Sequence, residues 1–140
     1  MKKNIQIFVL ITCSAFLSQS LSAAEKLDDK GFEKLMKEVG KTQKGFKKNQ
    51  DEKNSAAMAK DATRLAEIYT EVAGFWKARK VSDATKWSEE SATSANAAAT
   101  AAKAGEWDKV QGHIQSLMKN CKSCHEAHRE KLDDGSSRIK

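Results

Sequence analysis

Apolar residues recur every three or four positions in four separate stretches of this chain, which is the spacing of one face of an α-helix. The first stretch covers residues 27–48, and its apolar face is formed by Phe32, Leu35, Met36, Val39 and Phe46. The second begins near Ser55, a good N-cap, and continues to about Trp76. These two stretches predict two amphipathic helices, separated by the polar run at 49–54.

The other two stretches are bounded by helix start and stop signals. Ser82 and Asp83 form a capping pair before an alanine-rich stretch that reaches Ala104, and Gly105 then ends this third predicted helix. The fourth predicted helix runs from Trp107 to His128. One of its faces carries Val110, Ile114, Leu117, Met118, Cys121, Cys124 and His125.

The composition favours long helices. The sequence has no proline and only 7 glycines, and it contains no run typical of a strand. Four helices of about 20 residues with short polar links predict an all-α fold, an antiparallel up-down-up-down four-helix bundle. No linker indicates a second domain.

The first 24 residues have the features of a signal peptide. Lys2 and Lys3 precede an apolar run at 5–17 that is too short to span a bilayer, and small residues occupy 22–24. We therefore expect cleavage before Glu25 and a domain of residues 25–140 that is exported to the periplasm. An uncleaved N-terminal anchor is the alternative. Cys13 lies inside the apolar run and would not belong to the domain.

The other two cysteines belong to the sequence CKSCH at residues 121–125. Two cysteines in an exported protein ordinarily indicate a disulfide, but C-x-x-C-H is the attachment motif of haem c. Cys121 and Cys124 would form the thioethers and His125 would bind the iron, because positions i, i+3 and i+4 share one face of a helix. A zinc site would need more ligands, and a thioredoxin-like pair would need a helix N-terminus.

A second iron ligand from the protein has to come from upstream of the motif. Only 15 residues follow His125 and none is a methionine, so we expect the upstream helices to form the haem pocket. Met118 and His113 share the helix of His125 and cannot reach the opposite side of the iron. Met36 and Met58 remain as candidates.

The chain resembles the class II c-type cytochromes, the cytochrome c′ family of four-helix bundles with a haem motif near the C-terminus. Residues 104–110 (AGEWDKV) and 121–129 (CKSCHEAHR) carry the resemblance, and Trp87 is similar to the tryptophan that opens the family's third helix. The resemblance implies a single haem c and a position for Arg129 close to the proximal imidazole. His128 replaces an aromatic residue of the family, and we expect it near the haem edge.

The family divides on the residue above the iron. One branch places a methionine there, and the other places an apolar residue that leaves the sixth position empty. The sequence KLMK at 34–37 resembles the methionine branch, which implies Met36 as the distal ligand of a low-spin iron. The alternative is that Met36 is a core residue while Leu35 or Phe32 shields the iron.

These features predict a periplasmic monohaem electron carrier that cycles between Fe(III) and Fe(II). The sequence contains no constellation of general acid, base and nucleophile, so we do not expect an enzyme. A five-coordinate protein that binds nitric oxide or carbon monoxide is the alternative, because the same fold can serve both roles. A haem subunit held in a larger respiratory complex is a third interpretation.

The charge pattern bears on partners. The net charge is +6, and lysines recur by three and four along the first predicted helix: Lys30, Lys34, Lys37, Lys41, Lys44 and Lys48. This lysine stripe could dock acidic redox donor and acceptor proteins, although solvated lysine faces are common on amphipathic helices. We do not expect nucleic-acid binding. The bulky aromatic residues would pack in the core and around the haem, or would seal a homodimer of the kind that the family often forms.

Overall fold

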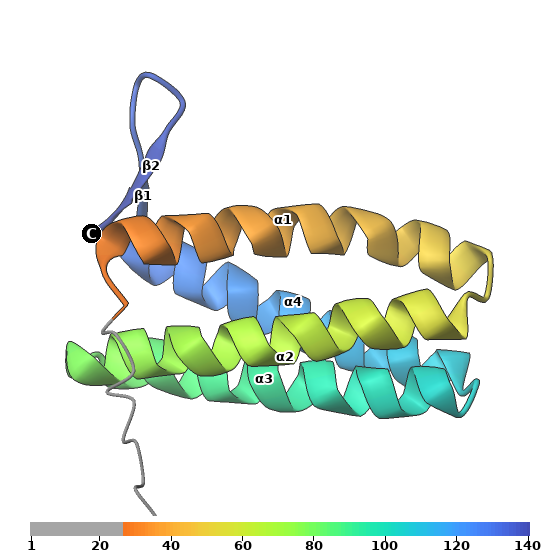
Figure 1. Cartoon of the computed structure of the whole chain (residues 1–140). Helices are drawn as coiled ribbons and strands as arrows, with labels where there is room; N and C mark the ends of the chain where they lie inside the picture. The colour runs from red at the N-terminus through yellow and green to blue at the C-terminus, as the bar shows by residue number, and fades with distance from the viewer. Residues whose placement is uncertain (1–26) are drawn as a thin grey trace, which may run out of the picture.

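The computed structural model describes residues 27–140, and the predicted signal peptide lies outside them. The helices of the described part are α1 (Asp29–Asp51), α2 (Ser55–Ala78), α3 (Ser82–Lys103) and α4 (Trp107–His128). Successive helices run antiparallel and are joined by short loops (Figure 1). The predicted bundle of four packed helices is therefore confirmed. No helix among residues 27–140 is long and apolar enough to cross a membrane.

Most helix ends lie within two residues of the sequence signals, but α1 continues to Asp51, three residues beyond its predicted end. The predicted capping pair Ser82 and Asp83 lies inside α3, whose N-cap is Val81 without a side-chain cap hydrogen bond. Asn54, rather than Ser55, caps α2, because its side chain accepts a hydrogen bond from the backbone N–H of Ala57 at 3.1 Å. The chain leaves α3 through Gly105, whose φ of 71° lies in the left-handed region that favours glycine. The apolar spacing is interrupted at residues 42–43, yet α1 is continuous through them.

The core is built mainly on α2 and α3. α2 supplies large apolar side chains, and the buried face of α3 consists of alanine and serine, which lets the two helices approach closely. α4 adds Val110 and Leu117 to this core, and α1 adds Leu35, Val39 and Phe46.

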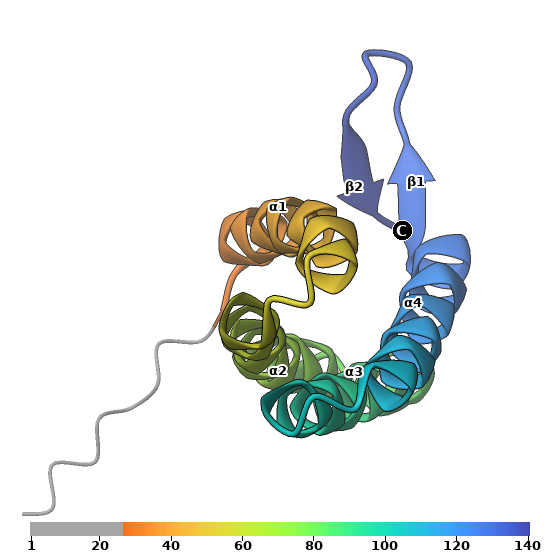
Figure 2. The same ribbon diagram turned by 90° about the vertical axis from the view of Figure 1, so that its right-hand side faces the viewer.

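The first and last helices of the bundle do not pack closely against each other. α1 packs on α2, and α4 packs on α3, so the helices form a ring that is open between α1 and α4 (Figure 2). The motif at 121–125 lies on the α4 side of this opening. A bundle closed on all sides would have filled this position with interlocking side chains.

The prediction of no strand was wrong at the C-terminal end of the described chain. β1 (Arg129–Lys131) follows α4 directly and pairs antiparallel with β2 (Ser137–Ile139), with Arg129 opposite Ile139. The turn contains Gly135 with a φ of 81°. Strands of three residues are too short to show the alternation that reveals longer strands. The hairpin projects from the bundle at the end where α1 begins and α4 ends (Figure 1).

Candidate functional site

A pocket of about 1210 Å³ lies between α1 and α4. α1 and α4 line its two sides, α2 and α3 line its back, and the hairpin lines one end. The expectation that only helices upstream of the motif would form the pocket was therefore wrong, since residues 135–139 contribute as well. Pockets for small molecules and cofactors are typically about 300–1,000 Å³, so this one has room for a large cofactor.

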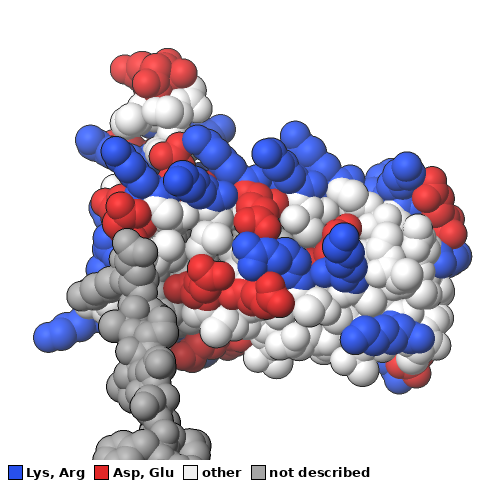
Figure 3. Space-filling view, viewed as in Figure 1, with Lys and Arg blue, Asp and Glu red and all other residues white. Residues whose placement is uncertain are grey.

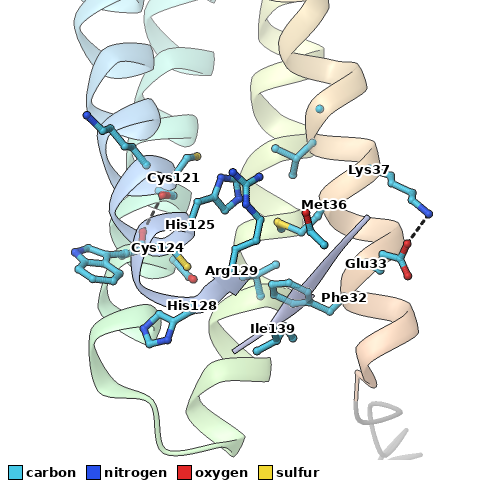
Figure 4. A pocket seen from close by; sticks show the side chains of 18 of the residues that line it. Phe32, Glu33, Met36, Lys37, Cys121, Cys124, His125, His128, Arg129 and Ile139 are labelled. Atoms are coloured by element: carbon cyan, nitrogen blue, oxygen red, sulfur yellow. Dashed lines mark hydrogen bonds and ion pairs between the residues drawn. The ribbon is translucent and has the colours of Figure 1, made fainter. Parts of the chain in front are cut away.

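All five site residues predicted from the sequence line this pocket. Cys121, Cys124 and His125 lie on the inner face of α4, because residues three and four positions apart share one face of a helix. Met36 extends from α1 on the other side, and Arg129 begins the hairpin (Figure 4). The structure thus brings together residues that are about 90 positions apart in the sequence.

The two cysteines are free, partly buried thiols. The hydroxyl of Tyr69 lies 2.9 Å from Cys121 Sγ, and Gln43 Nε2 donates to the same sulfur at 3.9 Å. Burial raises the pKa of the Cys121 thiol. Burial, followed by the proximity of Cys121 and Asp83, raises the pKa of Cys124 to about 11. Both sulfurs are therefore protonated at neutral pH.

His125 is held as a neutral imidazole. Burial lowers its pKa, and the nearby positive charge of Arg129 lowers it further. Figure 4 shows the Arg129 side chain reaching back into the pocket toward His125. A neutral imidazole is the form that can bind a metal ion through a ring nitrogen.

His128 lies at the edge of the same pocket but has other partners. Its Nε2 is 3.1 Å from both carboxylate oxygens of Asp83 at the start of α3. Its ring packs against Trp76 and Trp87, with centroid distances of 5.2 and 6.2 Å. His128 therefore joins α4 to α3 and leaves His125 as the histidine that faces the pocket interior.

The structure separates the two candidate methionines. Met36 is partly buried and lines the pocket, whereas Met58 is fully buried in the core near the start of α2 and does not line it. Met118 lines the pocket from the helix of His125 and is 46% exposed. Met36 is therefore the methionine that faces His125 from another helix.

Sequence reasoning missed three contributors to the site. Tyr69 and Gln43 contact Cys121 directly, and the hairpin forms one end of the pocket. Tyr69 stands in helical register with other core residues of α2, which predicts that it is buried but not that it contacts sulfur. The dipeptide Asp134-Gly135 is a known hairpin signal and could have revealed the turn.

Within residues 27–140, no cluster of three or more His, Cys, Asp or Glu side chains is arranged to hold a metal ion. Comparison of the chain with protein-family models, curated proteins and solved structures gave no significant match. The resemblance to the class II cytochromes therefore rests on the residues named above.

Proposed function

We propose that this protein is an exported monohaem c-type cytochrome of the cytochrome c′ family that carries electrons and belongs to the methionine-ligated, low-spin branch. The observation that carries the proposal is the juxtaposition of the CKSCH motif on α4 with Met36 on α1 across one large pocket. These helices are neighbours across the opening of the ring and do not pack closely on each other, so their separation leaves space for a flat group between them.

The residues of the pocket fit haem c. Phe32, Val39, Val72 and Ile139 give the lining the apolar character that a porphyrin requires. The same pocket holds two free cysteine thiols and a neutral imidazole on one face of α4, which is the donor set that covalent attachment of haem c requires.

In this proposal each site residue has a separate role. Cys121 and Cys124 would hold the haem through thioether bonds, and the imidazole of His125 and the thioether of Met36 would be the ligands of its iron. The bound haem supplies a one-electron Fe(III)/Fe(II) couple, and methionine ligation raises its potential. Arg129 favours the neutral imidazole of His125 that binding requires.

The lysine stripe gives the proposed carrier a surface for partners. Lysine and arginine side chains gather along the edge of the molecule where α1 runs (Figure 3). Lys37 and Lys48 pair with Glu33 and Glu52, whereas other members of the stripe have no ion-pair partner among the described residues. A positive edge beside the pocket suits acidic redox donors and acceptors in the periplasm. We propose no nucleic-acid partner and no catalytic reaction.

The test is to export the full chain in a host that matures c-type cytochromes and to measure its mass and absorption spectrum. We expect a chain that begins at Glu25, carries one covalent haem and has a low-spin spectrum in both oxidation states. A chain without covalent haem would overturn the proposal. A high-spin spectrum with binding of carbon monoxide or nitric oxide would instead favour the five-coordinate alternative, and the sedimentation of the loaded protein would show whether it forms a homodimer.

A further inference from the structure

The sulfur of Cys121 is a point at which three helices of the bundle meet. Tyr69 on α2 places its hydroxyl 2.9 Å from Cys121 Sγ, and Gln43 on α1 donates to the same sulfur from Nε2 at 3.9 Å. Both side chains line the pocket beside Cys121. The sulfur of Cys124 has no hydrogen-bond partner among the described residues. The two cysteines of the motif therefore have different surroundings.

The hydrogen bond from Gln43 is the one that joins α1 to α4 across the opening, in the part of the chain that the structure describes. The other hydrogen bonds that α1 side chains make with neighbouring elements go to α2 and its C-cap: Glu38 with Arg64, Asn49 with Asp61, and Asp29 with Arg79. These contacts hold α1 on α2, and none of them touches α4. The offset of α1 relative to α4 therefore depends on Gln43.

This contact and the two proposed iron ligands occupy matching places on two antiparallel helices (Figure 1). Gln43 lies seven residues after Met36 on α1, which is two helical turns, or about 10 Å, further along the same face. Cys121 lies four residues before His125 on α4, which is one turn, or about 6 Å, away. Because the helices run in opposite directions, both displacements point the same way along the bundle. Contact between Gln43 and Cys121 therefore brings Met36 and His125 to similar levels of the pocket.

The chemistry of the contact suits an alkylated sulfur. A thiol both donates and accepts hydrogen bonds, whereas a thioether sulfur only accepts them. The hydroxyl of Tyr69 and the side-chain amide of Gln43 can both donate. Formation of a thioether at Cys121 is therefore compatible with both hydrogen bonds.

We infer that Gln43 and Tyr69 are positioning residues, which hold the Cys121 sulfur from two helices and thereby keep α1 at the offset in which Met36 faces His125. The inference rests on the proposed function and names the contacts that favour its low-spin branch over the five-coordinate alternative. Without the Gln43 contact α1 keeps its attachments to α2, but Met36 is held less firmly and an external ligand displaces it more easily. Tyr69 acts less directly, because it fixes the sulfur that Gln43 contacts.

The first test measures how fast carbon monoxide displaces Met36 in the ferrous, haem-loaded chain. We expect Gln43→Leu to accelerate the reaction by about threefold, because the lost hydrogen bond is weak, and Tyr69→Phe to accelerate it by a smaller factor. Gln111→Leu removes an exposed glutamine of α4 outside the pocket, so it is the matched control and should keep the wild-type rate. Met58→Ala destabilises the core away from the pocket and should also keep that rate, which separates a loss of positioning from a general loss of stability.

The second test uses the haem-free chain and follows amide hydrogen exchange of α1. Gln43→Leu should speed exchange in residues 29–51 by about threefold and leave α2 and α3 unchanged, because a link of α1 alone is lost. An unchanged carbon monoxide rate or unchanged exchange in Gln43→Leu overturns the inference. The proposed function fails separately, if the exported wild-type chain carries no covalent haem or if wild type and Met36→Ala bind carbon monoxide at the same rate.

Discussion

Met36 on α1 and His125 on α4 lie on opposite sides of one pocket and point toward each other across it (Figure 4). The relationship depends on α1, because α4 is packed firmly on α3 and fixes the position of His125. α1 is attached to the rest of the bundle mainly through α2 and through Leu35, Val39 and Phe46. A group bound between Met36 and His125 would therefore add the link that the bundle lacks.

Met36→Ala tests this link in the haem-loaded protein. Removing the thioether is expected to convert a low-spin iron to a high-spin iron that binds carbon monoxide, because no other methionine reaches the pocket from α1, α2 or α3 in the described chain. The absorption spectrum with and without carbon monoxide measures the change. An unchanged low-spin spectrum would exclude Met36 as a ligand.

Met58→Ala is the matched control, since it removes the same side chain from a different place. Met58 is fully buried and does not line the pocket, so the spectrum should remain that of the wild type. The free energy of unfolding should instead fall by about 2–5 kcal/mol, the usual cost of truncating a buried methionine. Urea denaturation gives this number, and a spectral change in Met58→Ala would contradict the assignment of the two methionines.

Tyr69→Phe isolates the contact between the Tyr69 hydroxyl and Cys121 Sγ, which are 2.9 Å apart. The ring keeps its place in the core, and only the hydrogen bond is lost. We expect the haem-free chain to lose about 1 kcal/mol of stability, because a net intramolecular hydrogen bond contributes about that much. Equal urea midpoints for wild type and variant would mean that the contact contributes nothing.

The two thiols should be slow to react in the folded, haem-free chain. Burial, together with the proximity of Cys121 and Asp83, raises the pKa of Cys124 from an ordinary value of 9.0 to about 11, and the thiolate is the reactive form. At pH 8 the folded chain should alkylate Cys124 about 100-fold more slowly than the urea-unfolded chain. The folded state holds the Cys124 proton more tightly, so the contribution of this thiol to stability is constant below pH 9 and falls as the pH rises from 9 toward 11. Mass spectrometry of iodoacetamide-treated samples measures the rates.

His125 should make the haem-free chain sensitive to acid. Burial and Arg129 lower its pKa below the usual 6.5, so the unfolded chain binds a proton more readily than the folded chain. The contribution of His125 to stability is present above pH 6.5 and is lost as the pH falls through its folded pKa. Urea midpoints at pH 7.5 and 5.0 should therefore differ less in His125→Asn than in the wild type. His113→Asn, a histidine substitution outside the pocket, should keep the wild-type difference.

The helices could be read from the sequence because each carries its own signals. Gly105 marks the end of α3 by local chemistry, although the N-cap of α2 is Asn54 and not the predicted Ser55. The apolar residues of α2 identify its buried face without knowledge of the partner helix. The shared face of Cys121, Cys124 and His125 follows from helical geometry alone. The spacing of apolar residues does not show which helices pack on each other. The opening between α1 and α4 therefore could not be predicted from it.

The hairpin and the contacts to Cys121 could not be predicted from the sequence for a different reason. Tyr69 and Gln43 reach the sulfur from two other helices, and such contacts depend on how those helices are rotated and offset. The hairpin consists of strands too short to show a period, and its position depends on Ile139 packing against the core. Local patterns report burial and element type, whereas these features arise only when distant elements meet.

The lysine stripe should accelerate electron transfer with anionic reagents if its charge acts at the pocket. Lys34 and Lys41 are exposed on α1 and have no ion-pair partner among the described residues, so their charge is free to attract an anion. In the haem-loaded protein, Lys34→Glu combined with Lys41→Glu should slow oxidation by hexacyanoferrate(III) by about tenfold at low ionic strength, and the difference should shrink as salt screens the charges. Reaction with hexaammineruthenium, a cation, should respond in the opposite direction.

Lys60→Glu on α2, an exposed lysine outside the pocket, is the control and should leave both rates nearly unchanged. Rates that are independent of salt in the wild type would mean that the stripe is a solvated surface without a part in electron transfer.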